Sequence, residues 1–506
     1  MKNLLGMLLC LLPLLSISQQ EIHSLWEKSY LPKGKKSSEK VHDAIWLPDG
    51  NIALVGEVAN KRTQRDGLII IINSENGEVL DRMELANFGD EALKAVVYGD
   101  YSLYAVGYTN KGLIDGKNGW LVELNWQDES LSLLRDTVLG SNLEDEFLEI
   151  VWTDNSTALI GGVSGTYDDS AWLLNWNGKK VAYETTIAKG ISKNLVGMEK
   201  GNDGRIWVCG NTYSKRTEGN IWWVEVDQYG KEYGLDLLGD DVGEVLHHSN
   251  RSVRGDLLLA GETWESNVDQ DAWMHQLKFN RKDKVLGKYN QKEDERATTL
   301  LEAPEGIYWM TIRSTPKGFG NFYPKTLLLL WNELTAEDPF LKKELVFSKK
   351  SEFVAVHFLR TPKNEYVLVG NLTRGKKRKK SQIHLKAWDR KSLLLAKGFV
   401  ELQHRNVQVV DQDGDGYISA HEKGAIKFSI KNLGDGDFEG GEIQVIELSK
   451  VVGLTVTQKK QYINYLPKGS EDFYSVPLIG KANLREGEYN FYSEIRFSFP
   501  QISFSN

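Results

Sequence analysis

Four carboxylates lie within twelve residues near position 411, and this density is the clearest chemical feature of the sequence. The segment from Asp411 to Glu422 reads Asp-Gln-Asp-Gly-Asp-Gly-Tyr-Ile-Ser-Ala-His-Glu. Asp and Gly are common in turns, but carboxylates placed so closely repel one another unless a cation binds between them. A flexible cage of six to eight oxygen atoms suits Ca²⁺, whereas Mg²⁺ demands a smaller and more regular site. The sequence therefore predicts a calcium site.

The spacing of these residues resembles the calcium-binding loop of EF-hand proteins. The resemblance implies six ligand positions: the side chains of Asp411, Asp413 and Asp415, the backbone carbonyl of Tyr417, Ser419 (where a water often mediates) and a bidentate Glu422. Gly416 would permit the sharp turn of the loop, and Ile418 would be its apolar anchor. No second loop pairs with this one.

The residues on either side of the loop depart from the EF-hand pattern. Gln403–Val410 is expected to be extended, and Gly424 follows the loop almost at once. The opening motion of sensor EF-hands needs flanking helices, for which neither side has room. We therefore expect a structural calcium staple at a domain junction, with the affinity of extracellular modules, a Kd of about 10⁻⁴–10⁻³ M.

The rest of the sequence offers little further chemistry, and no catalytic or cofactor-binding residue is identified. His-Glu-x-x-His, Gly-x-Ser-x-Gly, phosphate-loop and paired-cysteine motifs do not occur. His247-His248 and His357 are expected on inner strands, where they could approach a central channel, although adjacent strand residues point to opposite faces. Packed or solvated histidines are the default interpretation. The recurring pairs Asp90-Glu91, Asp145-Glu146 and Asp294-Glu295 favour a role at a turn or strand start.

A repeat of about fifty residues organises most of the chain. Six copies have a second strand ending in glycine, at Gly56, Gly107, Gly161, Gly210, Gly261 and Gly370, and one copy has Thr311-Ile312 there. The third strand begins near positions 67, 119, 171, 221, 272, 326 and 383. Seven such copies predict the four-stranded blades of a β-propeller. His23–Tyr30 is expected to be an outermost strand that pairs with the last blade.

These motifs resemble the β-propeller repeats of secreted bacterial proteins. The resemblance covers roughly residues 40–400 and implies an all-β propeller fold; together with the seven copies it leads us to expect a seven-bladed propeller over residues 22–402. After Glu401 the period stops, and short alternating strands over residues 407–506 suggest a β-sandwich. The Ile426–Gly434 run and the Leu-Pro-x-Gly turn at Leu466 resemble CARDB-type immunoglobulin-like (Ig-like) domains of exported bacterial proteins.

The N-terminus has the order of a secretory signal peptide. Lys2 precedes an apolar run, Leu4–Leu15, and the small residues Ser16 and Ser18 follow it. Residues 1–18 are therefore expected to be removed on export to the periplasm, the cell surface or the medium. That run is too short to cross a bilayer, and no transmembrane segment is expected elsewhere.

Charge and cysteine content exclude further classes. The net charge of −8 disfavours nucleic acid as a partner. Only Cys10 and Cys209 occur, and Cys10 leaves with the signal peptide, so no intrachain disulfide is expected. Cys209 is expected to be a small core residue.

Three functional hypotheses follow. The first is a calcium-binding scaffold whose propeller contacts a protein or glycan ligand. The second is a secreted propeller enzyme, a lyase or glycoside hydrolase acting on polysaccharide. The third is part of a larger sensory or surface assembly. Convergent carboxylates or histidines with perturbed pKa values would favour the enzyme.

Overall fold

The computed structural model describes residues 24–30, 37–59, 65–86, 89–110, 116–141, 143–153, 157–166, 170–191, 194–201, 203–212, 220–239, 243–253, 255–266, 269–277, 284–289, 293–303, 308–316, 324–331, 341–345, 351–361, 365–374, 380–389, 402–415, 417–433, 441–447, 452–463, 466–467, 469–484 and 491–497. Within these residues the chain is all-β, with strands β1–β35 and no helix. The expected signal peptide, residues 1–18, lies outside them. No helix in the described part of the chain is both long and apolar enough to cross a membrane.

Strands β1–β28 form seven four-stranded antiparallel sheets, and all but the last consist of four consecutive strands. In chain order the first six are β2 (Ser38–Trp46), β3 (Ile52–Ala59), β4 (Asp66–Ile72), β5 (Val79–Leu85); β6 (Glu91–Gly99), β7 (Ser102–Thr109), β8 (Asn118–Gln127), β9 (Ser130–Leu139); β10 (Asp145–Trp152), β11 (Ala158–Ser164), β12 (Ala171–Trp176), β13 (Val181–Ile187); β14 (Asn194–Lys200), β15 (Ile206–Thr212), β16 (Asn220–Val226), β17 (Glu232–Leu238); β18 (Gly243–Arg251), β19 (Leu257–Ser266), β20 (Asp269–Leu277), β21 (Lys284–Tyr289); and β22 (Asp294–Glu302), β23 (Tyr308–Thr315), β24 (Lys325–Trp331), β25 (Leu341–Leu345).

The seventh sheet joins the two ends of this region. It consists of β26 (Ser351–Arg360), β27 (Glu365–Arg374), β28 (Lys380–Asp389) and β1 (Trp26–Tyr30). β1 pairs antiparallel with β28, with Trp26 opposite Ala387 and Tyr30 opposite Ile383. The expected pairing of the N-terminal strand with the last repeat is therefore confirmed.

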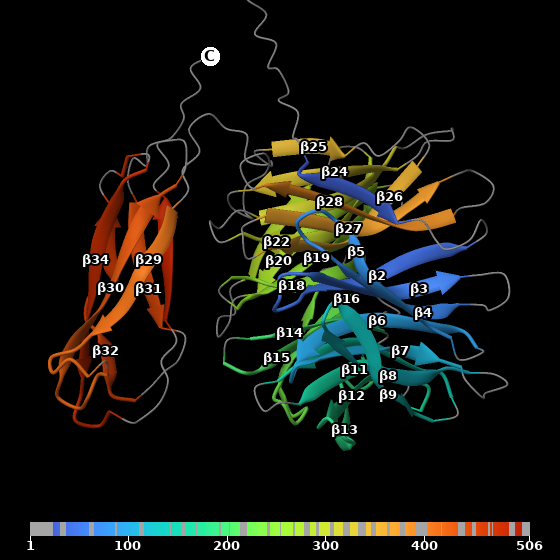
Figure 1. Cartoon of the computed structure of the whole chain (residues 1–506), viewed down its shortest axis with the longest axis horizontal. Helices are drawn as coiled ribbons and strands as arrows, with labels where there is room; N and C mark the ends of the chain where they lie inside the picture. Colours follow the sequence, from blue (N-terminus) through green and yellow to red (C-terminus); the bar gives the residue numbers. More distant parts are fainter. Residues whose placement is uncertain are drawn as a thin grey trace, which may run out of the picture.

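The sheets are arranged like the blades of a propeller. The first strand of each sheet contacts the first strand of the next, through β2, β6, β10, β14, β18, β22 and β26, and β26 contacts β2. Seven apolar clusters each lie between two consecutive sheets, so a sheet that could not bury both faces alone is covered on both by its neighbours. Figure 1 shows these sheets as one group of strands, coloured from blue to yellow.

The repeated glycine has a local cause. Each first strand carries a one-residue bulge, and the residue just before the bulge pairs with the second-strand glycine. A Cβ on Gly56 would overlap the carbonyl oxygen of Lys40, and one on Gly107 would overlap that of Ala92. In the third sheet the residue at this position is Gly162, which pairs with Phe147, and not Gly161 as expected. In the sixth sheet it is Ile312.

The remaining strands form two sheets, drawn in orange and red in Figure 1. One contains β29 (Leu402–Val410), β30 (Lys423–Asn432), β34 (Glu471–Gly480) and β32 (Leu454–Val456), and the other contains β33 (Lys460–Ile463), β31 (Gly441–Glu447) and β35 (Phe491–Phe497). Ile443 of the second sheet packs in one core with Phe428, Tyr474 and Val476 of the first. β29, which spans the boundary expected at 402–407, pairs with β30.

Candidate functional site

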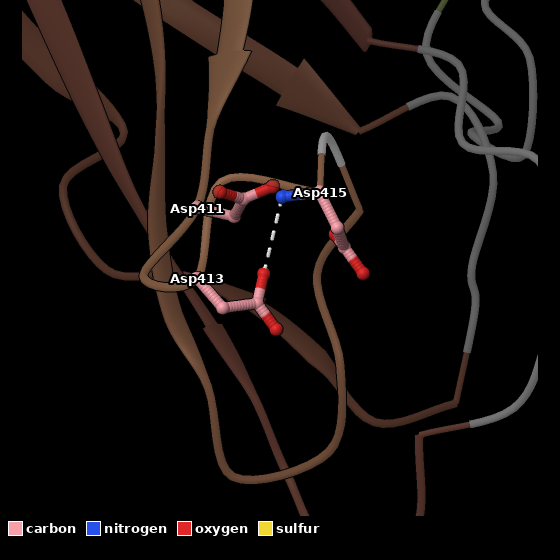
Figure 2. Close-up of side chains that lie close together, drawn as sticks. All are labelled: Asp411, Asp413 and Asp415. Carbon is pink, nitrogen blue, oxygen red and sulfur yellow. Dashed lines mark hydrogen bonds between the residues drawn. The ribbon is translucent and has the colours of Figure 1, made fainter.

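The acidic loop Asp411–Glu422 connects two adjacent strands of one sheet. β29 ends at Val410 and β30 begins at Lys423, so strands and not helices flank the loop. Figure 2 shows the side chains of Asp411, Asp413 and Asp415 gathered at one turn, and one carboxylate oxygen from each lies within 4.8 Å of the others. The Asp415 N–H donates to Asp413 Oδ1 over 3.2 Å. The three carboxylates are thus held so close together that they repel one another, and a shared cation would relieve this repulsion.

Glu422 closes the loop from its far end. Glu422 is buried, with 8% of its surface exposed. Its Oε1 accepts the Gln412 N–H at 2.8 Å, and its Oε2 accepts the Ser419 N–H at 2.6 Å. The backbone N–H of Gly480 on β34 donates to the Glu422 carbonyl at 2.9 Å, which ties this end of the loop to the sheet. Oε1 also accepts the Asp413 N–H at 3.4 Å, whereas Oε2 keeps a lone pair beyond its single bond, so a contact with a cation through Oε2 is compatible with these bonds.

Ile418 and Gly424 set the position of the loop. Ile418 is partly buried against the core between the two C-terminal sheets, as expected of an apolar anchor, and a Cβ on Gly424 would overlap its side chain. Tyr417 is 75% exposed, and Ser419 is exposed. Gly416, the residue expected to allow the sharp turn, lies outside the described residues.

A second group of ionisable side chains, which the sequence did not reveal as a group, lies on the first strands of five sheets. We call Asp43 (β2), Glu149 (β10), Glu199 (β14), His248 (β18) and His357 (β26) the axial cluster. Asp43 Oδ1 lies 3.5 Å from His357 Nδ1, and the rings of His357 and His248 meet edge to face with centroids 5.8 Å apart. The charge of Asp43 also acts on Glu149 and Glu199. Some of these interactions join sheets that are not neighbours: Asp43 is on the first sheet, whereas Glu149 and Glu199 are on the third and fourth. Such interactions are possible where the first strands face one another, so the cluster lies there.

Burial of the axial cluster favours the uncharged forms of its ionisable groups, compared with the same groups in water. Burial raises the pKa of Glu199 to about 7 and raises the pKa of Glu149 well above its usual range. Burial also raises the pKa of Asp43, although the nearby His357 acts in the opposite direction. Burial and the His357 ring lower the pKa of His248 to about 3, and burial lowers the pKa of His357. Both imidazoles are therefore neutral near pH 7.

Other residues highlighted in the sequence have structural positions. β6, β10 and β22 begin at the recurring acidic pairs, and Glu91, Asp145 and Glu295 are fully buried there. His247, the neighbour of His248, is not in the axial cluster and lies 3.3 Å from Glu262 instead. Cys209 is buried in the core between the fourth and fifth sheets, as expected.

Comparison with known proteins gives no family. No family model matches the chain. No curated protein matches it either.

Several solved structures share its arrangement at low similarity. The β-propeller domain of the Trilobed protease from Pyrococcus furiosus is 11% identical, with a TM-score of 0.40, and the match covers 68% of this chain and 95% of that one. YCF48 bound to D1 peptide is 11% identical, with a TM-score of 0.44 and coverage of 71% and 94%. Puromycin hydrolase is 10% identical, with a TM-score of 0.45, and the match covers 77% of this chain and 58% of that one. At these values the fold assignment rests on the strand pairing of the chain itself.

Proposed function

We propose that this protein is an exported calcium-binding protein in which a seven-bladed propeller forms a binding platform and an Ig-like sandwich carries a structural Ca²⁺ site. The observation that supports calcium is the convergence of the Asp411, Asp413 and Asp415 carboxylates within 4.8 Å. Glu422 and the carbonyl of Tyr417 would complete the oxygen set, with Ser419 contributing directly or through water. Bound Ca²⁺ neutralises the mutual repulsion of these groups and joins β29 to β30.

Calorimetric titration of the full chain with Ca²⁺ tests the site. We expect one Ca²⁺ per chain and loss of this binding in Asp411→Ala and Glu422→Ala. Gln412→Ala is the matched control because its exposed side chain lies in the same loop and carries no charge, so it should bind like the native protein. Equal binding in all four proteins, or no binding in the native one, would refute the calcium site.

The platform role is supported by apolar side chains on the outermost strands of two sheets. On β9, Leu133, Leu134 and Val138 are exposed, and on β17 Tyr233, Leu235 and Leu237 are exposed. Exposed apolar groups that gather on an outermost strand favour contact with a protein over contact with a glycan. A photo-crosslinking residue at position 134 should trap a discrete protein adduct in the envelope, and one at Asp128 should not. Identical products from both positions would count against the platform.

The second candidate, a secreted enzyme acting on polysaccharide, is favoured by the axial cluster alone. A carboxylic acid whose pKa is about 7, such as Glu199, suits general acid catalysis near neutral pH. Reducing-sugar and unsaturated-product assays on acidic and neutral polysaccharides would test it. Activity that disappears in Glu199→Gln would establish this candidate, and absence of activity on every substrate would remove its support.

A further inference from the structure

The axial cluster has an unusual charge composition. Three carboxyl groups, those of Asp43, Glu149 and Glu199, lie on first strands of the sheets, as do the imidazoles of His248 and His357, whose rings meet with centroids 5.8 Å apart. Arg251 is the basic side chain whose charge acts on Glu199, while Glu149 is influenced by the two other carboxyls. Carboxyl groups that share a poorly solvated site favour either protonation or a bound cation. The cluster therefore offers the kinds of donor group that a cation site requires.

The spacing of two donor atoms fits a metal ion. Asp43 Oδ1 and His357 Nδ1 are 3.5 Å apart. Two ligands at 2.0–2.1 Å from a tetrahedral zinc ion are separated by about 3.4 Å. Asp43 is itself held in place, since its Oδ2 accepts the Val96 N–H of the second sheet at 2.9 Å and its Oδ1 accepts the Ala44 N–H at 2.7 Å. The pair is thus fixed at a separation close to that of two ligands of one ion.

His248 supplies the second, independent observation. Its Nε2 atom is buried and has no hydrogen-bond partner among the described residues. The Leu300 backbone hydrogen-bonds to the ring, which leaves Nε2 as the free nitrogen. A hydrogen bond at one ring nitrogen commonly orients the other toward a metal. A buried imidazole nitrogen without a hydrogen bond has lost its contacts with water and gained none in the protein, which costs free energy. A bound metal ion would supply an interaction for this nitrogen.

We propose that the axial cluster binds a divalent transition-metal ion such as Zn²⁺ through Asp43, His248 and His357, with Glu149 or Glu199 balancing its charge. Mixed imidazole and carboxylate donors suit Zn²⁺ and its neighbours, whereas Ca²⁺ takes oxygen ligands only. The site is thus distinct in metal class from the loop Asp411–Glu422. In the described residues three donors lie within 4.8 Å only in that loop, so binding of the ion requires the His248 ring to shift toward the Asp43–His357 pair.

The test uses the full chain, stripped of metal and then saturated with Ca²⁺ so that the acidic loop is occupied. Zn²⁺ affinity is measured by competition with a chromophoric chelator, and Co²⁺ absorption reports directly on the ligands. We expect one Zn²⁺ per chain, with affinity lowered at least about tenfold in His357→Gln and in Asp43→Asn. His247→Gln is the matched control, because His247 lies on the same strand as His248 but pairs with Glu262.

Two results would overturn the proposal. One is a native protein that binds no Zn²⁺ when the loop is saturated with Ca²⁺. The other is equal affinity in the native protein, His357→Gln and His247→Gln, which would place any bound zinc elsewhere on the surface. Far-ultraviolet circular dichroism and the melting temperature of each variant separate loss of the site from loss of the fold. Asp43→Asn keeps the shape of the side chain, so a folded variant remains for measurement if a histidine substitution unfolds the chain.

Discussion

Glu422→Gln separates the hydrogen-bonding role of this carboxylate, which the structure shows, from the calcium-ligand role proposed for it. The change keeps the shape of the side chain but replaces one oxygen by an amide nitrogen. In the folded protein the two carboxylate oxygens accept the backbone N–H groups of Gln412 and Ser419 at 2.8 and 2.6 Å. A glutamine can accept only one of these bonds through its oxygen. It also loses the charge and the bidentate geometry that Ca²⁺ prefers at this position.

The expected magnitudes differ with and without calcium. With a chelator present, Glu422→Gln loses one hydrogen bond to a charged acceptor, which costs about 1.5–3 kcal/mol of stability. At a Ca²⁺ concentration of about 100 times a Kd of about 10⁻⁴ M, the proposed site would add about 2.7 kcal/mol to the stability of the native protein, which the variant lacks. The variant is then less stable than the native protein by about 4–6 kcal/mol. For a domain of about 100 residues, the calcium term alone raises the native Tm by about 10–20 °C.

Differential scanning calorimetry of the full chain, in calcium and in chelator, measures both terms. Gln412→Ala should show the native calcium response, because it retains every acidic side chain of the loop. The reasoning is refuted if the C-terminal transition of the native protein melts at the same temperature in both buffers. It is also refuted if Glu422→Gln keeps the full calcium response.

Three further perturbations follow from buried contacts. Arg82→Ala leaves the fully buried Glu39, whose Oε1 lies 2.8 Å from the guanidinium, without its partner, and we expect a loss of about 3–5 kcal/mol in chemical denaturation. Gly107→Ala drives a Cβ into the Ala92 carbonyl oxygen, and we expect a loss of about 1–3 kcal/mol by the same measurement. The pKa of Glu199 is about 7 in the folded protein and about 4.3 unfolded, so stability falls as pH rises through this interval. Glu199→Gln should therefore raise the denaturation midpoint at pH 8 in metal-free buffer and have little effect at pH 4.

Each of these expectations has a contrary outcome. Glu39→Gln added to Arg82→Ala should recover part of the lost stability, and an unchanged double variant would show that an unpaired charge is not the cause. A Gly107→Ala protein as stable as the native one would mean that the bulge of β6 relaxes freely. A Glu199→Gln midpoint equal to the native value at pH 8 would mean that this carboxyl is not destabilised by ionisation.

Much of the fold was predictable because the repeat leaves a periodic pattern. The seven segments expected as third strands lie in β4, β8, β12, β16, β20, β24 and β28. The glycine of the third copy was misplaced by one residue because Gly161 and Gly162 are adjacent, and only the register shows that Gly162 faces the bulge. Gly161 instead leaves room for the Met198 side chain of the next sheet. Two adjacent glycines with different roles look equivalent in a sequence.

The two candidate sites differed in how far the sequence could predict them. The acidic loop is contiguous, so its resemblance to an EF-hand loop implies six candidate ligands from the sequence. The axial cluster draws single residues from β2, β10, β14, β18 and β26, and nothing local distinguishes them. One signal was present: Asp43, Glu149, His248 and His357 each stand thirteen positions before the glycine of the next strand in their copy. Recognising this spacing requires knowing which glycine in each copy pairs with the residue before the bulge. The sequence alone does not show where the bulge lies.

The strand β1 makes the last sheet depend on both ends of a long stretch of chain. Ser29 Oγ contacts His384 Nδ1 across 355 sequence positions, so this contact cannot form during synthesis until most of the protein has been made. Until then β1 has no partner strand, and its bare backbone amides and carbonyls are a template on which strands of other molecules can add. The interval between translation of the two partners is therefore the period in which this protein is most exposed to aggregation, and a chaperone that covers β1 would protect it.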